Sequence, residues 1–185
     1  PFDPQRLYVA THSGFYTSTD GGKSWSDLGW NTPPSSPAGM LWRMEPDPYQ
    51  RGHLLVGIVS GTYGIGTGWL YSSSNYGVSW QAITMPNDLA WISNIAFHPI
   101  TPGLVYLTAA GVYRSTDSGM SWDRIDNPQQ PEMQTAASVV IATHPRPMLL
   151  VGTAPYPYRS LDGGATWERA KSLPGVSAYM FADGD

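Results

Sequence analysis

The sequence predicts an all-β protein built as a β-propeller, whose four-stranded antiparallel sheets are called blades. Three observations support this prediction. The chain of 185 residues contains 20 Gly and 17 Pro, which disfavour long helices. Hydrophobic residues make up 41% of the chain, enough to form a core that a disordered chain would lack. One eight-residue motif also occurs four times, at a spacing typical of propeller blades.

The repeated motif reads Ser-x-Asp/Asn-x-Gly-x-Ser/Thr-Trp. Its third residue recurs after 55, 42 and 45 residues, and repeats of about 40 to 50 residues match one four-stranded blade. In a tight turn, Asp or Asn accepts backbone hydrogen bonds and Gly supplies a positive φ. We therefore expect a structural role for the motif residues, with each Trp packed between neighbouring blades. They are Ser18, Asp20, Gly22, Trp25, Ser73, Asn75, Gly77, Trp80, Ser115, Asp117, Gly119, Trp122, Ser160, Asp162, Gly164 and Trp167.

Strand patterns surround every motif in the same order: strands A, B and C, the motif, and strand D. Runs rich in Val, Leu, Ile and Tyr define the first three strands. A strands are predicted at 41–48, 93–99 and 139–145, and B strands at 7–11, 54–58, 104–108 and 148–153. C strands are predicted at 14–17, 69–72, 111–114 and 156–159. A short D strand follows each motif Trp, as at 122–125.

These units divide the chain into four blade-equivalents. They cover approximately residues 1–30, 39–84, 91–126 and 136–171. Residues 176–185 match a further A strand, which would either close the first blade or open a fifth. We therefore expect residues 1–185 to form a single propeller domain or a fragment of a larger one.

The four motifs and their flanks closely resemble the Asp-box, or BNR, repeat of sialidases, the sortilin luminal domain, xyloglucanases and the photosystem II assembly-factor family. The resemblance covers nearly the whole chain, with a departure at Asn75, where an amide replaces the carboxylate. It implies a β-propeller whose Asp-boxes are the C–D turns and whose ligands meet the opposite end. Because this superfamily contains both hydrolases and binding proteins, the repeat alone does not decide the activity.

The B–C and D–A loops form that opposite end. B–C loops are predicted at 12–13, 60–68, 109–110 and 154–155, and D–A loops at 30–38, 85–91, 127–134 and 172–175. The glycine-rich segment 60–68 matches a mobile hairpin better than a phosphate site, since no helix follows it. Arg43 is included among the candidates because its predicted inner strand would face the channel. The candidate ligand-binding residues are Trp30, Tyr63, Trp69, Trp91, His12 and Arg43.

A catalytic site is harder to place in the sequence. A sialidase-like site would resemble three arginines that clamp a carboxylate, beside a Tyr–Glu nucleophile pair, and no such pairing is evident. Glycoside hydrolysis needs two carboxylates across the scissile bond. Asp88 and Glu132, in D–A loops of adjacent blades, are weak candidates for them, and solvated loop carboxylates are the alternative interpretation.

No metal and no cofactor is expected. The chain has no Cys, so thiolate ligands are absent. His98 and His144 recur in equivalent positions before Pro, which indicates a role in the repeated turn rather than in a zinc site.

Charge and hydropathy restrict the partners. The net charge is −4 and the ten basic residues are scattered, which argues against nucleic acid. No apolar run reaches the length of a membrane span, so direct membrane insertion is not expected. We expect a non-enzymatic binding or assembly-scaffold module, extracellular or periplasmic, that recognises a protein or glycan through the B–C and D–A loops. The alternative is part of a secreted glycoside hydrolase with an incomplete active site; further blades or a second copy would be additional partners.

Overall fold

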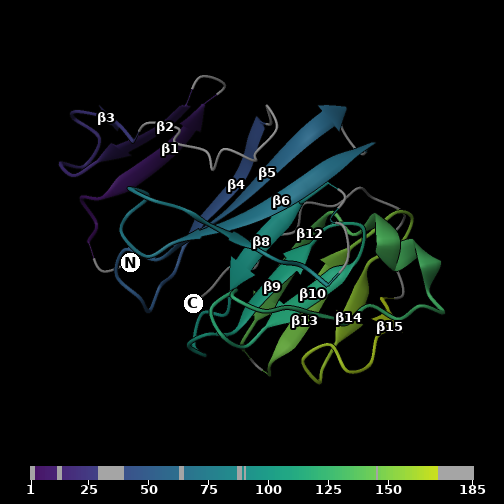
Figure 1. The fold of residues 1–185 in the computed structure, drawn as a ribbon. Helices are drawn as coiled ribbons and strands as arrows, with labels where there is room; N and C mark the ends of the chain where they lie inside the picture. The colour runs from purple at the N-terminus through teal and green to yellow at the C-terminus, as the bar shows by residue number, and fades with distance from the viewer. Residues whose placement is uncertain are drawn as a thin grey trace.

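The computed structural model describes residues 3–11, 14–28, 40–62, 65–86, 89, 91–144 and 146–170. Over these residues the chain forms a succession of antiparallel sheets (Figure 1). The first sheet has three strands and each of the next three has four. Hydrogen-bonded neighbours are consecutive in the chain, so each sheet is a simple meander. This all-β propeller architecture confirms the predicted fold class, and we number the sheets as blades 1 to 4.

The strands lie close to the positions that the sequence predicts. Blade 1 contains β1 (Leu7–Thr11), β2 (Gly14–Ser18) and β3 (Ser26–Asp27). Blade 2 contains β4 (Met40–Pro46), β5 (Leu54–Thr62), β6 (Ile65–Ser73) and β7 (Gln81–Ile83). Blade 3 contains β8 (Asn94–Phe97), β9 (Val105–Thr108), β10 (Val112–Ser115) and β11 (Asp123–Arg124). Blade 4 contains β12 (Ser138–Ala142), β13 (Met148–Gly152), β14 (Tyr158–Ser160) and β15 (Glu168–Arg169).

The B–C hairpin of blade 2 is longer than predicted. Strands β5 and β6 stay paired from Leu54 opposite Ser73 to Thr62 opposite Ile65, so most of segment 60–68 belongs to the sheet rather than to a loop. Within this hairpin, Gly68 donates its backbone N–H to the carbonyl oxygen of Leu89 at 2.8 Å. This bridge joins the D–A segment to β6.

The connection between blades 3 and 4 also differs from the predicted loop. Residues Pro131–Thr135 form a short 3-10 helix, η1. Its Met133 is fully buried and packs with Tyr106 of blade 3 and Val139 of blade 4. Proline at the start supplies the backbone φ that a helix requires. The buried Met133 thus anchors the connection between the two blades.

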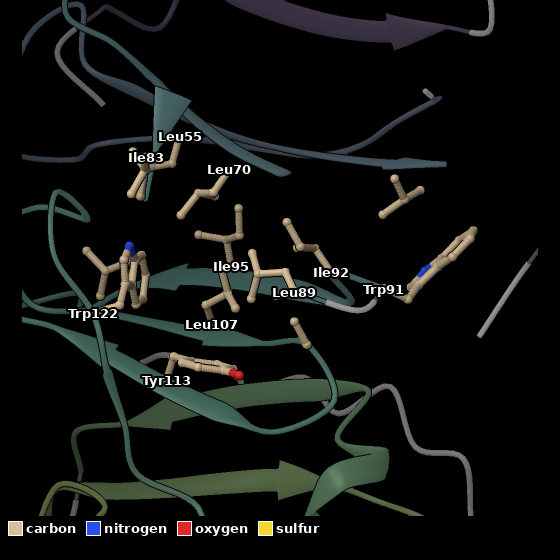
Figure 2. Close-up of a cluster of buried hydrophobic side chains, with 13 residues drawn as sticks. Leu55, Leu70, Ile83, Leu89, Trp91, Ile92, Ile95, Leu107, Tyr113 and Trp122 are labelled. Carbon is tan, nitrogen blue, oxygen red and sulfur yellow. The ribbon is translucent and has the colours of Figure 1, made fainter. Parts of the chain in front are cut away.

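Apolar side chains fill the space between consecutive blades. The largest cluster lies between blades 2 and 3, where Leu55 and Leu70 point toward Ile95 and Leu107 (Figure 2). A second cluster joins blades 3 and 4, and a third joins Phe15 of blade 1 to blade 2. Alternate residues of a strand point to opposite faces of its sheet, so a blade between two others is apolar on both faces.

The Asp-box turns share one set of hydrogen bonds, illustrated by blade 3. The Ser115 hydroxyl donates to Asp117 Oδ1 at 2.7 Å and accepts from Gly119 N–H at 2.8 Å. Asp117 Oδ1 also accepts from Ser121 N–H at 2.8 Å, and its Oδ2 accepts the Ser121 hydroxyl at 2.5 Å. Corresponding bonds to Ser24 and to Thr166 hold the pKa of Asp20 and Asp162 to about 2. These carboxylates are therefore ionised and engaged within their own turns.

Asn75 gives the same turn with an amide. Its Oδ1 accepts from the Ser73 hydroxyl at 3.0 Å and from Ser79 N–H at 2.9 Å. Its Nδ2 donates to Ser79 Oγ at 2.9 Å, so the last hydrogen bond runs in the opposite direction from that in an Asp box. The departure from the repeat changes a donor but preserves the turn geometry.

Replacing Asp117 with Ala is expected to lower the free energy of unfolding by about 1–2 kcal/mol, because the backbone donors of Met120 and Ser121 lose their acceptor. Asp117→Asn is expected to lose less than half as much, since Asn75 shows that the turn accepts an amide. Urea denaturation of the three proteins measures both changes. Equal losses for the Ala and Asn variants would contradict the role of the Asp117 side chain as the acceptor of these backbone N–H groups.

The motif tryptophans do not all pack between blades as predicted. Trp122 and Trp167 are buried, and Trp80 packs against Phe15 of the preceding blade with ring centroids 5.7 Å apart. Trp25 is instead exposed. Its Nε1–H still donates within the turn, to the Gly22 carbonyl at 3.1 Å, but no blade precedes blade 1 in the described part of the chain.

Candidate functional site

The predicted site residues divide into two groups. Trp69, Trp91, Arg43 and Glu132 belong to the described residues. His12, Trp30, Tyr63 and Asp88 lie outside them. The proposed Asp88–Glu132 carboxylate pair therefore has one described member.

Glu132 lies on η1 and is hydrogen-bonded to a tyrosine of the next blade. The Tyr158 hydroxyl donates to Glu132 Oε2 at 3.3 Å, so the structure contains a Tyr–Glu pair where the sequence predicted none. Burial, together with the Glu132 charge, raises the pKa of Tyr158. A nucleophilic phenolate requires the opposite shift, and Tyr158 is buried. The pair therefore acts as a hydrogen-bonded support for η1.

Further contacts attach η1 and the preceding residue Gln130 to blade 4. Thr135 Oγ1 accepts from Ala154 N–H at 3.1 Å, and Gln130 Nε2 donates to the Trp167 carbonyl at 3.4 Å. Beside the B–C turn of blade 4, the Arg169 guanidinium stacks over the ring of Tyr156. We call Glu132, Tyr156 and Arg169 the η1 cluster. It combines a carboxylate, a phenol and a guanidinium at the B–C and D–A end of the fold.

Burial removes two tryptophans from the expected binding surface. Trp91 is 8% exposed and belongs to the cluster between blades 2 and 3, at the end of the row in Figure 2. Its ring therefore lacks the open face that stacking on a sugar requires. Trp69 is half-buried and packs against the apolar cluster between blades 1 and 2. Both rings fill space between blades because the C strand and D–A segment that carry them run along the core.

Arg43 lies on an inner strand, as the sequence predicts, but it reaches the neighbouring blade. Strand β4 contacts β8, and β8 contacts β12, which identifies the A strands as the innermost ones. The Arg43 guanidinium Nε donates to the Ser93 carbonyl at 2.7 Å. This bond joins blades 2 and 3, so Arg43 contributes to their packing instead of lining an open channel.

Glu45, which the sequence did not single out, has an unusual pKa for a carboxyl group. It lies two residues beyond Arg43 on β4 and pairs with the buried Leu55. Burial raises its pKa to about 7, although the positive charge of Arg43 acts in the opposite direction. A carboxyl on an inner strand among apolar residues was the sequence signal for this shift. Glu45 lies toward the Asp-box end of β4, away from the η1 cluster.

A buried Asp–His–Ser network also escaped the sequence reasoning. His53 Nδ1 lies 2.9 Å from Asp47 Oδ2, and His53 Nε2 lies 3.1 Å from Ser72 Oγ. The sequence signal for the network is that His53 and Ser72 depart from the repeat. The equivalent positions in blade 3 hold Leu104 and Arg114. All three residues are buried; Asp47 and His53 contribute to the lining of a neighbouring hollow, and Ser72 does not. We interpret the network as support for the A–B turn of blade 2.

A hollow of about 130 Å³ lies at the Asp-box end between blades 1 and 2. Arg6, Tyr8 and Tyr76 contribute to its lining, and the Arg6 guanidinium lies 4.3 Å from the Tyr76 ring centre.

Two features are absent from the described residues. No three His, Asp or Glu side chains among them are close enough together to hold a metal ion. Within the same residues, no helix has the length and apolar character needed to cross a membrane.

Two known families match parts of the chain. The Sortilin-Vps10 family, described as sortilin, neurotensin receptor 3, matches residues 68–183. The chain belongs to the Sortilin-Vps10 family. The BNR/Asp-box repeat also matches this Sortilin-Vps10 chain at residues 16–27, which contain the turn of blade 1. The predicted resemblance to Asp-box proteins is thus confirmed.

Curated relatives of this Sortilin-Vps10 chain include two xyloglucanases. Xyloglucanase Xgh74A of Acetivibrio thermocellus is 29% identical over 175 residues, a match that covers 71% of this chain and 19% of that protein. A xyloglucanase of a Paenibacillus species is 31% identical over 175 residues, covering 71% of this chain and 16% of that protein. The chain therefore spans less than a fifth of the length of these relatives.

Solved structures share the fold. An ancestral GH74 enzyme superposes with a TM-score of 0.73 at 20% identity, covering 95% of this chain and 25% of that one. The GH74 xyloglucanase from Xanthomonas campestris gives a TM-score of 0.67 at 21% identity, covering 92% and 29%. At this level of identity the likeness shows the propeller fold alone.

Proposed function

We propose that the chain forms a glycan-binding part of a xyloglucanase-like propeller and holds polysaccharide without itself hydrolysing it. The relatives at 29% and 31% identity are xyloglucanases, which supports a β-glucan ligand of the xyloglucan class. The observation that carries the non-hydrolytic part is the hydrogen bond between Glu132 and the buried Tyr158. This bond occupies Glu132, the member of the predicted Asp88–Glu132 pair that the structure describes, in supporting η1.

The η1 cluster is the proposed contact surface. Glycans are bound by aromatic rings together with polar groups that exchange hydrogen bonds with hydroxyls, and Tyr156, Arg169 and Glu132 provide these groups at one end of the fold. The hydrogen bonds between the Thr135 hydroxyl of η1 and the Ala154 backbone hold them in place. A preorganised surface of this kind avoids part of the ordering cost of binding.

Isothermal titration calorimetry with xyloglucan oligosaccharides tests the proposal. We expect Tyr156→Ala to weaken binding about five- to thirtyfold, because about 1–2 kcal/mol of ring contact is lost. Tyr76→Ala is the matched control, since Tyr76 is an exposed tyrosine of an Asp-box turn at the opposite end. Equal weakening by both variants, or no binding by the unmodified chain, would refute the proposal.

A hydrolytic role is the second candidate, favoured by the xyloglucanase relatives and by Glu45. A carboxyl group with a pKa of about 7 is protonated near neutral pH, which is the property of the acid in a glycosidase. Measuring the reducing ends released from xyloglucan decides between the candidates. Activity that disappears in Glu45→Gln, or in the pair Asp88→Asn and Glu132→Gln, would favour hydrolysis; no release by the unmodified chain would favour binding alone.

A further inference from the structure

The hollow between blades 1 and 2 lies at the opposite end of the fold from the η1 cluster. Its volume is about 130 Å³, and a protein cavity of about 150 Å³ holds one benzene molecule. Its walls come from β1 and from the turns of two consecutive blades. An A strand of blade 1 would pair with β1 in the plane of the sheet, as β4 pairs with β5, so it would lie beside this space and not in it.

Two side chains of blade 1 face the hollow. Arg6 and Tyr8 are two positions apart at the entry to β1, so they project to the same side. Tyr8 holds the register position of Leu55, which packs against the blade that follows its own. The Arg6 guanidinium lies 4.3 Å from the Tyr76 ring centre. A cation–π contact from blade 1 to blade 2 therefore forms one side of the hollow.

Tyr76 has a backbone conformation that disfavours a tyrosine. Its φ is +63°, and a bulky residue is strained in this left-handed region. The same position of the other Asp boxes holds Gly21, Ser118 and Gly163, so two blades use the residue that avoids the strain. A Cβ on Gly52 would lie 3.1 Å from Tyr76 Cδ2, which shows that the ring packs on the A–B turn. Strained residues of this kind concentrate at functional sites.

The two acidic residues of the lining already accept hydrogen bonds within their own turns. Asp3 Oδ1 accepts from the Gln5 N–H at 2.9 Å. Asp47 Oδ1 accepts from the Tyr49 N–H at 2.7 Å, and its Oδ2 lies 2.9 Å from His53 Nδ1. These bonds stabilise both carboxylates inside the chain, so the arginines are the charged groups directed at a ligand.

The arginines favour a ligand with one negative charge. A guanidinium donates two parallel hydrogen bonds to a carboxylate, and stacking on a ring leaves the N–H groups at its edge directed outward. Arg51 adds a second positive charge to the lining. The positive charges of Arg6 and Arg51 cancel the negative charges of Asp3 and Asp47, so a dianion is less suitable than a monoanion.

The remaining wall is largely apolar and includes Pro46, Leu54 and the ring of Tyr8. We propose that the hollow binds a small organic monocarboxylate, whose carboxylate pairs with the Arg6 guanidinium and whose apolar body lies against Pro46 and Tyr8. Burial raises the pKa of Tyr8, so its hydroxyl stays protonated and is available as a donor to the same carboxylate. This site is separate from the glycan surface at the η1 cluster and does not depend on it.

An NMR titration of the isotope-labelled chain with sodium benzoate tests the proposal. We expect the backbone amide signals of Tyr8, Gly52 and Tyr76 to shift along one saturating curve, while those of the η1 cluster stay in place. Benzamide has nearly the same shape without the charge, so it should bind at least about tenfold more weakly. Equal binding of benzoate and benzamide, or no shift at the hollow with benzoate, would overturn the proposal.

Substitutions identify the groups that bind benzoate. Arg6→Gln should weaken binding at least about tenfold, because the charged donors are removed. Tyr76→Gly introduces the residue that blades 1 and 4 have at this position, so it should keep the thermal midpoint and weaken binding through the loss of the ring under Arg6. Arg159→Gln is the matched control, since Arg159 pairs with Glu168 on the surface of blade 4, and it should bind benzoate normally. Unchanged affinity in Arg6→Gln, or equal weakening in Arg159→Gln, would refute the site.

Discussion

Replacing Gly119 with Ala is expected to lower the free energy of unfolding by about 2–5 kcal/mol. Gly119 has a φ of +89°, which costs an alanine about 1–2 kcal/mol. The added Cβ would also lie 2.5 Å from Leu55 Cδ1 and 2.9 Å from Leu55 Cδ2. Leu55 is fully buried and cannot move aside freely, so overpacking adds about 1–3 kcal/mol. Urea denaturation monitored by tryptophan fluorescence measures the loss.

Gly22→Ala separates the two contributions to this loss. Gly22 has a φ of +91°, so its backbone strain matches that of Gly119, but a Cβ there keeps ordinary contacts of 3.4 Å or more. We expect a loss of about 1–2 kcal/mol for this control. If both variants lost the same stability, the contact between Leu55 and Gly119 would not contribute to blade packing.

Replacing Glu45 with Gln is expected to raise the free energy of unfolding at pH 8 by about 2–3 kcal/mol. Burial raises the pKa of Glu45 from 4.5 to about 7 in the folded chain, so near pH 8 the fold contains a carboxylate that burial disfavours. Each unit of pKa shift corresponds to about 1.4 kcal/mol. Glutamine resembles the protonated acid and removes this cost.

The pH dependence gives the sign of the Glu45 effect. A folded-state pKa above the unfolded value contributes stability that is complete below about pH 4.5 and is lost as the pH rises through about 7. The unmodified chain should therefore lose stability over this interval, and Glu45→Gln should lose less, so the two proteins should agree at pH 4. Glu168→Gln, on a carboxylate 66% exposed, is the control. Parallel pH profiles for all three proteins would show that Glu45 is not shifted.

Sequence periodicity predicted the strands well because the repeat supplies each blade with the same local signals. Alternating apolar residues and the turn formed by Ser115, Asp117 and Gly119 act over a few positions. The length of the β5–β6 hairpin was not predictable in this way, since pairing through Thr62 overrides the weak strand propensity of the glycines.

The candidate site was less predictable than the fold. The bond between Glu132 and Tyr158 joins residues 26 positions apart, and no local pattern encodes such a distance. The network of Asp47, His53 and Ser72 was detectable as a departure from the repeat. Its burial depends on the packing of the blades and required the structure.

In each contact that an Asp-box glycine makes with another blade, the aliphatic side chain belongs to the earlier blade and the glycine to the later one, which favours folding in chain order during synthesis. Leu55 leaves the ribosome before Gly119, and Ile125 before Gly164, so each new turn meets a surface that is already in place. Chains that emerge from their N-terminus can fold in units as they appear, and repeats contact mainly their nearest neighbours. Each finished blade would thus serve as the template for the next, and an error in one turn would stop assembly there while the earlier blades remained folded.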